Sequence, residues 1–513
     1  MDDAPGDDGP GGLDGAIAAG APVRQAVVDL GSNSVRLVVF EGCARNPLVI
    51  FNEKAVLRLA RGVETTGLLA DDALEAALTV MHRYHALARA MSVARFEVLA
   101  TSAVREAHNG PGFVAELARR MPDVPIRVLP GHEEAALSAA GVLCGIPAAD
   151  GILADIGGGS LELVRLRAGV AERAETLRLG VIRLAERAGG DTARARAIVQ
   201  AELDAVPWLA EGEGRDLYVV GGAWRALAYM HMVQTDYPLR IVHHYTISRE
   251  EARDLTGVIT ATPRRGLEKL AGASRRRLDD LPFAAVALRR VLRATGARRV
   301  VFSASGLREG WYMRAVPEAT ARQDPLLAAC REMAARHGRQ TELPPVLFDW
   351  TSPLFAPGGL AGESAEATRM RLAAAWVADI GSHEHPDYRA EQAFLRLLRQ
   401  PGIALDHHGR AFLATAIALR YDATPEAAFL APARALLDPL SQHRAELLGV
   451  AFRLGFILSG GTPELLRASR LSVRDDLLTL HLDTGGGLFA GESVQRRLDR
   501  LGQVLGMRTL LAG

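Results

Sequence analysis

One six-residue pattern, Asp-x-Gly-x-x-Ser, occurs twice in this chain, at residues 29–34 and again at residues 155–160. In both copies an apolar run precedes the pattern, and a run of apolar residues alternating with polar ones follows it. A buried strand that enters a Gly- and Ser-rich turn and leaves as an alternating strand is typical of a β-hairpin. The repeat therefore predicts two copies of one hairpin and of the α/β domain built around it.

The two hairpin turns could form a phosphate-binding site. Gly and Ser allow a tight turn that leaves backbone N–H groups pointing outward, and such groups bind phosphate oxygens. The leading Asp29 and Asp155 repel phosphate, so each is expected to hold a cation or a water instead. The alternative is that the pattern marks an ordinary turn, because Asp, Gly and Ser are common turn formers. Two copies with matching flanks favour the phosphate interpretation.

A third glycine-containing segment follows the two hairpins. Residues 217–220 are an apolar strand that runs into Gly221-Gly222 and then into a helical pattern. In this order the segment resembles the third nucleotide-contacting loop of the superfamily that contains actin, the sugar kinases and the heat-shock chaperone ATPases. The resemblance implies an α/β fold with two duplicated actin-like (ribonuclease H-like) domains around a cleft.

Secondary-structure patterns support the duplication and change their character after residue 317. The first copy should begin with a hairpin and a third strand. Helices near 71–91 and 112–121 should then alternate with strands at 96–101 and 126–129, and a last helix should begin at about 132. The second should add a strand near 174–179, a helix at about 191–208 and strands ending near 222 and 303. Beyond 317 we expect helices to about 458, broken by a Pro- and Gly-containing loop near 344–362, and then a strand at 476–482 and a helix from about 492.

At 513 residues the chain is too long for one hydrophobic core. The expected parts are a disordered tail (1–22), two actin-like domains (23–147 and 148–316), an all-α HD-like domain (317–466) and a small α/β unit (467–513).

Composition excludes several classes of protein. Basic and acidic residues balance at 60 each, so no global field draws the chain to nucleic acid or to a membrane surface. The three cysteines, Cys43, Cys144 and Cys330, show no pair spacing, which fits a reducing compartment and disfavours a disulfide framework or a zinc site. No segment reads as a signal peptide or a membrane span, and a cytoplasmic location is expected.

Two acids open a predicted helix between the hairpins, in the word Gly131-His132-Glu133-Glu134-Ala135. Acids stabilise helix N-termini, so capping accounts for one of them. A carboxylate projected from a helix start into the cleft could instead activate a water. The helix end favours its ionised form, whereas Asp29 and Asp155 would raise its pKa, and the sequence leaves that balance open.

Several motifs together resemble the exopolyphosphatase and guanosine pentaphosphate phosphohydrolase family. They are the two hairpin words with their flanks, the stretch at 100–107, the Gly-x-Glu-Glu-Ala word, Leu179-Gly180, Val219-Val220-Gly221-Gly222, and residues 303–310. The likeness is strong over about 25–315 and weaker beyond.

The resemblance implies hydrolysis of the terminal phosphoanhydride of inorganic polyphosphate, which releases orthophosphate. It places the water-activating carboxylate at Glu134, a bidentate phosphate contact at Arg105, and Mg²⁺ (or Mn²⁺) at Asp155 and Glu162, with Asp29 and Asp155 shaping the metal and water site. The phosphate-binding backbone would be that of Ser32, Asn33, Ser34, Gly157, Gly158, Gly159 and Ser160.

Two other functions remain open. Hydrolysis of guanosine pentaphosphate, which would link the protein to the stringent response, needs the same site and a nucleoside pocket. A non-catalytic sensor of phosphate-rich ligands is disfavoured because a binder has little use for four carboxylates beside a phosphate.

The C-terminal helices resemble the HD domain of longer family members. Ala378 stands where the His of the His-Asp dyad would be, before Asp379, and alanine cannot ligate a metal. A second active site is therefore not expected, despite His383, His385, His407 and His408. The resemblance suggests a role in homodimerisation or in enclosing a polymer channel.

A basic stretch at 264–299, with eleven basic and three acidic residues, could follow a polyanion or could be a solvated helix face.

Overall fold

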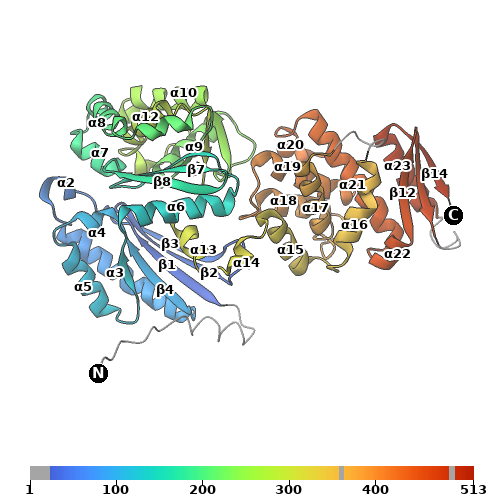
Figure 1. Ribbon diagram of the computed structural model, residues 1–513, viewed down its shortest axis with the longest axis horizontal. Helices are drawn as coiled ribbons and strands as arrows, with labels where there is room; N and C mark the ends of the chain where they lie inside the picture. Colours follow the sequence, from blue (N-terminus) through green and yellow to red (C-terminus); the bar gives the residue numbers. More distant parts are fainter. Residues whose placement is uncertain (1–22, 357–362, 484–490, 513) are drawn as a thin grey trace. The chain divides into compact units, whose positions relative to one another are not determined.

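The computed structural model describes residues 23–356, 363–483 and 491–512 (Figure 1). The tail expected at 1–22 lies outside the described residues. The chain divides into two compact units, one ending at Arg322 and the other beginning at Gln323. No helix among the described residues has both the length and the apolar character needed to cross a membrane.

The first unit contains two mixed β-sheets, and its first lobe is built on a five-stranded one. The strand order is β3-β2-β1-β4-β5, with β1, β4 and β5 parallel and the β1–β2–β3 meander antiparallel. Helices α3 (Asp71–Ala90) and α5 (Gly110–Arg120) cover one face. The strands are β1 (Arg24–Leu30), β2 (Ser34–Glu41), β3 (Leu48–Val56), β4 (Arg95–Ala100) and β5 (Ile126–Val128).

The second lobe repeats this topology. Its sheet has the order β10-β11-β9-β6-β7-β8, so that β6, β7, β8, β9 and β11 correspond to β1 to β5, and β10 is an additional edge strand. The helices that pack on its outer face are α8 (Thr192–Asp204), α9 (Gly222–Gln234), α10 (Arg249–Ala261) and α12 (Leu281–Thr295). The strands are β6 (Gly151–Ile156), β7 (Leu161–Arg167), β8 (Val170–Leu177), β9 (Asp216–Val220), β10 (Tyr245–Ser248) and β11 (Arg299–Phe302). The expected duplication is therefore present.

One strand expectation in this lobe needs correction, and one further strand was not expected. The strand expected near 174–179 is β8, which begins at Val170 because Ala168 and Gly169 form a turn with positive φ directly before it. Its exposed, charged residues hid its start from the sequence pattern. The four-residue β10 was not expected at all.

Helix α6 (Gly131–Gly145) lies between the two sheets, and it carries Glu134 (Figure 1). Its Leu137 joins the core of the first sheet, whereas Ala135 and Ala139 pack on the second. Helix α13 (Leu307–Met313) crosses α6 at backbone distance, since a Cβ on Gly310 would lie 1.8 Å from the Leu137 carbonyl oxygen. Both lobes therefore fix the position of α6.

Short helical segments complete the first unit. They are α2 (Val63–Thr66), α4 (Ser102–Glu106), α7 (Val181–Arg187), η1 (Pro207–Gly212), α11 (Arg264–Leu267), η2 (Arg275–Arg277) and α14 (Glu318–Ala321).

The second unit is a set of helices followed by a small sheet. The sheet has the order β12-β13-β14, with α23 (Glu492–Leu505) as the crossover between the parallel strands β13 and β14. Its strands are β12 (Ser469–Arg474), β13 (Leu477–Leu482) and β14 (Arg508–Ala512). Its other helices are α15 (Pro325–His337), α16 (Leu343–Thr351), η3 (Ser352–Leu354), α17 (Ala365–Val377), α18 (Arg389–Arg399), α19 (His407–Arg420), η4 (Ala428–Leu430), α20 (Ala431–Arg434), α21 (Pro439–Ser459) and α22 (Pro463–Arg467).

The prediction of a loop near 344–362 is wrong for its first part, because residues 343–351 form helix α16. Pro344 and Pro345 lie in the first turn of that helix, where a missing backbone N–H removes no helical hydrogen bond. Residues 357–362 lie outside the described part of the chain.

Candidate active site

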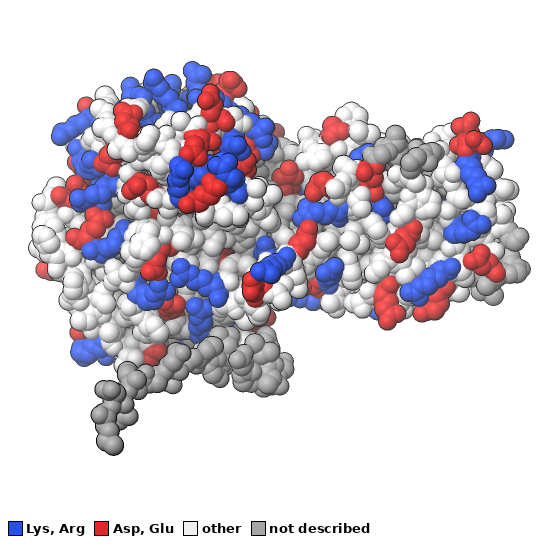
Figure 2. Space-filling model, in the orientation of Figure 1, with Lys and Arg blue, Asp and Glu red and all other residues white. Residues whose placement is uncertain are grey.

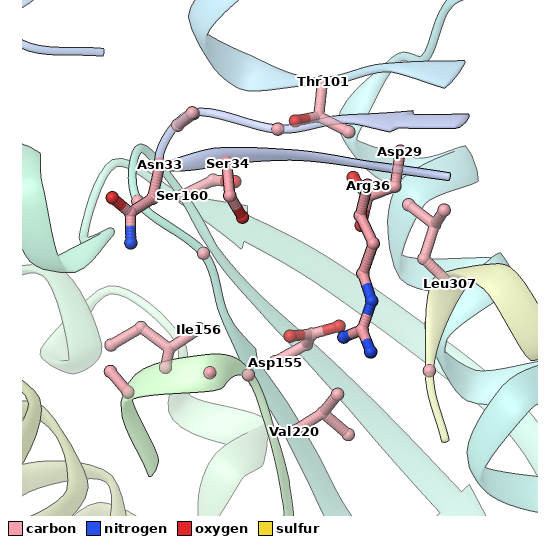
Figure 3. Close-up of a pocket in the computed structure, with 18 of the residues that line it drawn as sticks. Asp29, Asn33, Ser34, Arg36, Thr101, Asp155, Ile156, Ser160, Val220 and Leu307 are labelled. Carbon is pink, nitrogen blue, oxygen red and sulfur yellow. The ribbon is translucent and has the colours of Figure 1, made fainter. Parts of the chain in front are cut away.

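A cavity of about 140 Å³ lies between the two lobes of the first unit. Both hairpin turns line it, together with the Gly221-Gly222 turn at the start of α9 and residues that precede or begin α13. Figure 3 shows Asp29, Asn33, Ser34 and Arg36 of the first lobe facing Asp155, Ile156 and Val220 of the second across this cavity.

The two hairpin turns have the same internal geometry. In the first, the Gly31 N–H donates to the Ser34 carbonyl at 3.2 Å, and in the second the Gly157 N–H donates to the Ser160 carbonyl at 3.0 Å. Within the described residues, no backbone acceptor is found for the N–H groups of Ser32, Asn33 or Gly158. The turns thus present free amides to the cavity, as an oxyanion site requires.

Close contact, rather than backbone curvature, explains the glycines of the second turn. None of Gly31, Gly157, Gly158 and Gly159 has a positive φ, so these tight turns do not depend on the left-handed backbone conformation that favours glycine. A Cβ on Gly158 would lie 2.9 Å from the Cβ of Ser32, and one on Gly159 would lie 2.4 Å from the Ser102 hydroxyl. Only glycine lets the two turns approach this closely.

The expected phosphate-binding residues mostly meet at the cavity. Those that line it are Ser32, Asn33, Ser34, Gly157, Gly158 and Ser160. Gly159 is packed instead toward Ser102 of α4.

Asp155 and Glu162 are cross-strand partners in the β6–β7 ladder, so their side chains share one face of the hairpin. The Asp155 carboxylate accepts a 2.6 Å hydrogen bond from the Ser138 hydroxyl. Glu162 is buried, and its Oε1 has no hydrogen-bond partner among the described residues. An unpaired buried carboxylate oxygen beside a second carboxylate is an arrangement that a cation would stabilise.

Glu134 points into the cavity from the first turn of α6, as expected. Its Oε2 accepts a 3.0 Å hydrogen bond from Arg105 Nη1, which also donates to the Leu129 carbonyl at 2.5 Å. Arg105 lies behind Glu134 and is not among the described residues that line the cavity. Its observed partner is thus a carboxylate, and the phosphate contact stays a prediction.

Burial decides the pKa values of the four carboxylates. It raises the pKa of Glu134 to about 7, against the opposing charge and hydrogen bond of Arg105. Burial also raises the pKa of Asp155 and of Asp29, and it raises that of Glu162 strongly, with Glu134 and Asp155 adding repulsion. The balance that the sequence left open for Glu134 is therefore shifted toward the protonated form, chiefly by burial.

Five cationic side chains line the same cavity, and of these only Arg277 belongs to a segment for which polyanion binding was considered. They are Arg36, Lys54, Arg225, Arg277 and Arg308. Arg308 Nη1 donates to Asp29 at 3.1 Å, and Arg225 Nη1 donates to the Ala304 carbonyl at 3.2 Å.

Burial, and after it the crowding of like charges, destabilises the charged forms of Arg225 and Lys54. Burial followed by repulsion from Arg308 and Arg36 lowers the pKa of Arg225 to about 10. Partial burial, followed by repulsion from Arg277, Arg225 and Arg36, lowers the pKa of Lys54 to about 8. An anion with several charges would relieve this repulsion.

Some of these cations left a signal in the sequence. Arg277 belongs to the basic stretch at 264–299, and Arg308 to the word at 303–310. Arg36 is the second residue after the first hairpin word, which is the position that Glu162 holds after the second word. Lys54 carried no signal, because only the pairing of β3 with β2 brings it to the cavity.

The donor set suits Mg²⁺. Among the described residues, no group of three or more His, Cys, Asp or Glu side chains is arranged to hold a metal ion. Mg²⁺ commonly binds proteins through one or two carboxylates and completes its shell with water and substrate phosphate. Asp155 and Glu162 fit that mode.

A duplicated α/β fold whose hairpin turns, acids and cations surround one interlobe cavity resembles the actin-like fold. The chain belongs to the Ppx/GppA phosphatase family, whose profile matches residues 38–319. The profile of the exopolyphosphatase C-terminal domain matches residues 326–512.

Individual relatives agree with this assignment. Exopolyphosphatase 2 of Mycobacterium tuberculosis is 33% identical over 177 residues, which are 33% of this chain and 55% of the relative, so the chain spans about half the length of the curated relatives it matches. The crystal structure of an exopolyphosphatase-like protein has a TM-score of 0.51 and 25% identity, and the match covers 57% of this chain and 97% of that one. An exopolyphosphatase from Cytophaga hutchinsonii gives a TM-score of 0.51 and 24% identity, over 56% and 96%, which shows the shared fold.

At the position where the resemblance to an HD domain led us to expect the dyad, Asp379 forms ion pairs with arginines. Asp379 accepts hydrogen bonds from Arg339 Nε at 2.9 Å and from Arg420 Nη2 at 3.4 Å. Ala378 beside it is buried. Of the nearby histidines, His408 contacts Asp438 at 3.3 Å and His385 contacts Asp387 at 3.8 Å. The aspartate is therefore engaged by guanidinium groups.

Proposed function

We propose that the protein is an exopolyphosphatase that hydrolyses the terminal phosphoanhydride of inorganic polyphosphate. The observation that carries the proposal is the pairing, in one cavity, of four buried or half-buried carboxylates with five crowded cations. The carboxylates suit a cation and a water, and the cations suit a polymer with a negative charge on every unit.

The residues of this chain would have distinct roles in the proposed hydrolysis. Free amides of the two hairpin turns bind oxygens of the terminal phosphoryl group, and the cationic group holds the adjoining units. Arg105 fixes the Glu134 carboxylate, which orients a water and accepts its proton as the water oxygen attacks the terminal phosphorus. The bond from that phosphorus to the bridging oxygen breaks, and orthophosphate and a chain shorter by one unit result.

Asp155 and Glu162 would hold Mg²⁺, with Mn²⁺ as the possible substitute. When bound, the ion would neutralise charge that develops on the phosphoryl oxygens. Its charge would also keep the neighbouring carboxylates ionised, against the burial that raises their pKa.

Polyphosphate is favoured over guanosine pentaphosphate by the chemistry of the lining. Among the described residues that line the cavity there is no aromatic side chain on which a guanine base could stack. A linear polymer has no base to accommodate.

The test is phosphate release measured in parallel on long-chain polyphosphate and on guanosine pentaphosphate, for the wild type, Glu134→Gln and Glu133→Gln. Glu133 is a matched control because it is the preceding residue of the same helix turn and pairs with Arg127 instead. We expect faster release from polyphosphate, and a fall in kcat of about 10²-fold to 10⁴-fold on either substrate for Glu134→Gln only.

Faster phosphate release from guanosine pentaphosphate would overturn the substrate assignment. It would leave the assignment of the site residues unchanged. A Glu134→Gln enzyme as active as the wild type would overturn the role of Glu134. Binding of polyphosphate without any release by the wild type would support the sensor alternative.

Three further expectations belong to this proposal. The protein is expected to act in the cytoplasm and as a homodimer, which sedimentation measurements would test. The second unit is expected to be an HD-like module without metal chemistry that supports dimerisation or encloses a polymer channel.

A further inference from the structure

Helix α4 (Ser102–Glu106) connects three parts of the first unit through successive polar side chains. The Ser102 hydroxyl lies 2.8 Å from that of Ser32 in the first hairpin turn. Arg105 holds Glu134 on α6. Glu106, the last residue of α4, faces away from both and toward the second lobe.

The buried partner of Glu106 is Arg183 on α7 of the second lobe (Figure 1). Arg183 Nη1 lies 2.9 Å from Glu106 Oε2, and its Nε lies 3.1 Å from Glu64 Oε2 on α2. The Arg183 side chain is only 3% exposed, whereas both glutamates are 24% exposed. One buried guanidinium therefore joins two carboxylates of the opposite lobe.

The backbone of Arg183 is tied to the second hairpin turn. Its N–H donates to the Gly158 carbonyl at 3.2 Å, and Gly158 packs directly on Ser32. Arg178 adds exposed contacts to the same two glutamates, at 3.4 Å and 3.3 Å. The turn of the second lobe and the helix that holds Arg105 are thus connected through one side chain.

We propose that Arg183 is a positioning residue, whose ion pairs with Glu106 and Glu64 fix α4 against the second lobe and so hold Arg105 where it aims Glu134. The inference rests on the proposed hydrolytic function. If Arg183 is removed, α4 loses its buried ion pair with the second lobe and keeps the exposed one between Glu106 and Arg178. The Glu134 carboxylate is then held less firmly relative to both hairpin turns. Rates of positioned reactions fall steeply with displacements of about 1 Å.

The chain provides a matched control in Glu202. Its carboxylate pairs with Arg187, which lies on the same helix as Arg183, and its side chain is also 24% exposed. That pair stays within the second lobe. Glu106→Gln and Glu202→Gln therefore each remove one carboxylate partner from an α7 arginine, and only the first breaks a contact between lobes.

The experiment compares polyphosphate hydrolysis by the wild type, Arg183→Gln, Glu106→Gln and Glu202→Gln. We expect Arg183→Gln and Glu106→Gln to lower kcat about tenfold with KM changed less than about threefold, and Glu202→Gln to stay within about twofold of the wild type. Arg183→Lys, which keeps the charge but not the forked geometry, should fall between.

Amide hydrogen exchange gives a readout that needs no substrate. Exchange at residues 102–106 should be faster in Glu106→Gln than in Glu202→Gln. If Glu106→Gln and Glu202→Gln have equal kcat, or if α4 exchanges equally in both, the inference is wrong. If Arg183→Gln fails to fold, Glu106→Gln still tests the inference, because Arg183 keeps its ion pair with Glu64 in that variant. An inactive wild type would overturn the proposed function, and hydrogen exchange would still test the connection between lobes.

Discussion

Arg36 holds in the first hairpin the position that Glu162 holds in the second: each is the cross-strand partner of its hairpin aspartate, Asp29 or Asp155. The duplicated frame therefore places a cation on one wall of the cavity and an acid on the other. Figure 3 shows Arg36 extending into the cavity from the strand that follows its turn. Two halves with the same backbone topology thus have opposite chemistry.

This difference predicts separable defects. Glu162→Gln should raise the Mg²⁺ concentration for half-maximal activity about tenfold or more, because a neutral amide is a weaker ligand than a carboxylate. Arg36→Gln should raise KM for polyphosphate and leave the Mg²⁺ requirement within about twofold, because it removes a charge from the anion side. Mg²⁺ titrations at saturating polyphosphate measure the first effect and substrate titrations the second. Equal Mg²⁺ curves for wild type and Glu162→Gln would contradict the assignment.

The packed hairpin turns predict an asymmetry between neighbouring glycines. Gly158→Ala should lower kcat/KM about tenfold and destabilise the fold by about 1–3 kcal/mol, because its methyl group would lie 2.9 Å from Ser32 and force the turns apart. Gly157→Ala is the control, since the nearest atom would be 3.5 Å away. Thermal unfolding and phosphate release measure both variants. Identical behaviour of the two would show that the turns are not in close contact.

The raised pKa of Glu134 predicts a stability that depends on pH. Burial favours its protonated form in the folded protein, so its contribution is lost as pH rises from its ordinary pKa of 4.5 through about 7. Glu134→Gln cannot ionise, and it should be more stable than the wild type at pH 8, by on the order of 1–3 kcal/mol without Mg²⁺, but not at pH 5. Melting temperatures at both pH values check this. A stabilisation that is the same at pH 5 and pH 8 would refute it.

The ion pairs of Asp379 predict a structural role for this aspartate. Asp379→Asn should destabilise the protein by about 2–3 kcal/mol, because it leaves the buried Arg420 without its countercharge. Asp387→Asn, at a side chain that is 81% exposed, serves as the control and should change little. Melting curves with and without a chelator measure both. A loss for Asp379→Asn that a chelator reproduces in the wild type would indicate a metal instead.

Charge on the surface is mixed rather than concentrated over the visible face (Figure 2), in agreement with the balanced composition. The cations that matter for the proposed substrate lie in the cavity. Composition excluded a global attraction, and it could not reveal this local group.

The sequence by itself determined the two hairpins, the order of most strands and helices, and the placement of Glu134 at a helix start. These features depend on residues close together in the chain, whose apolar spacing and turn chemistry act locally. The same pattern predicts that β7 pairs with β6 as a hairpin. That pairing brings Asp155 close to Glu162.

Tertiary structure decided the rest. Lys54 and Arg277 reach the cavity from opposite lobes, Arg105 meets Glu134 across two helices, and Gly158 is needed because a distant turn touches it. Burial, which depends on every neighbour, set the pKa of Glu134 against the preference of its own helix end. Contacts between residues far apart in sequence leave no periodic trace in the chain, and so only the folded protein could supply them.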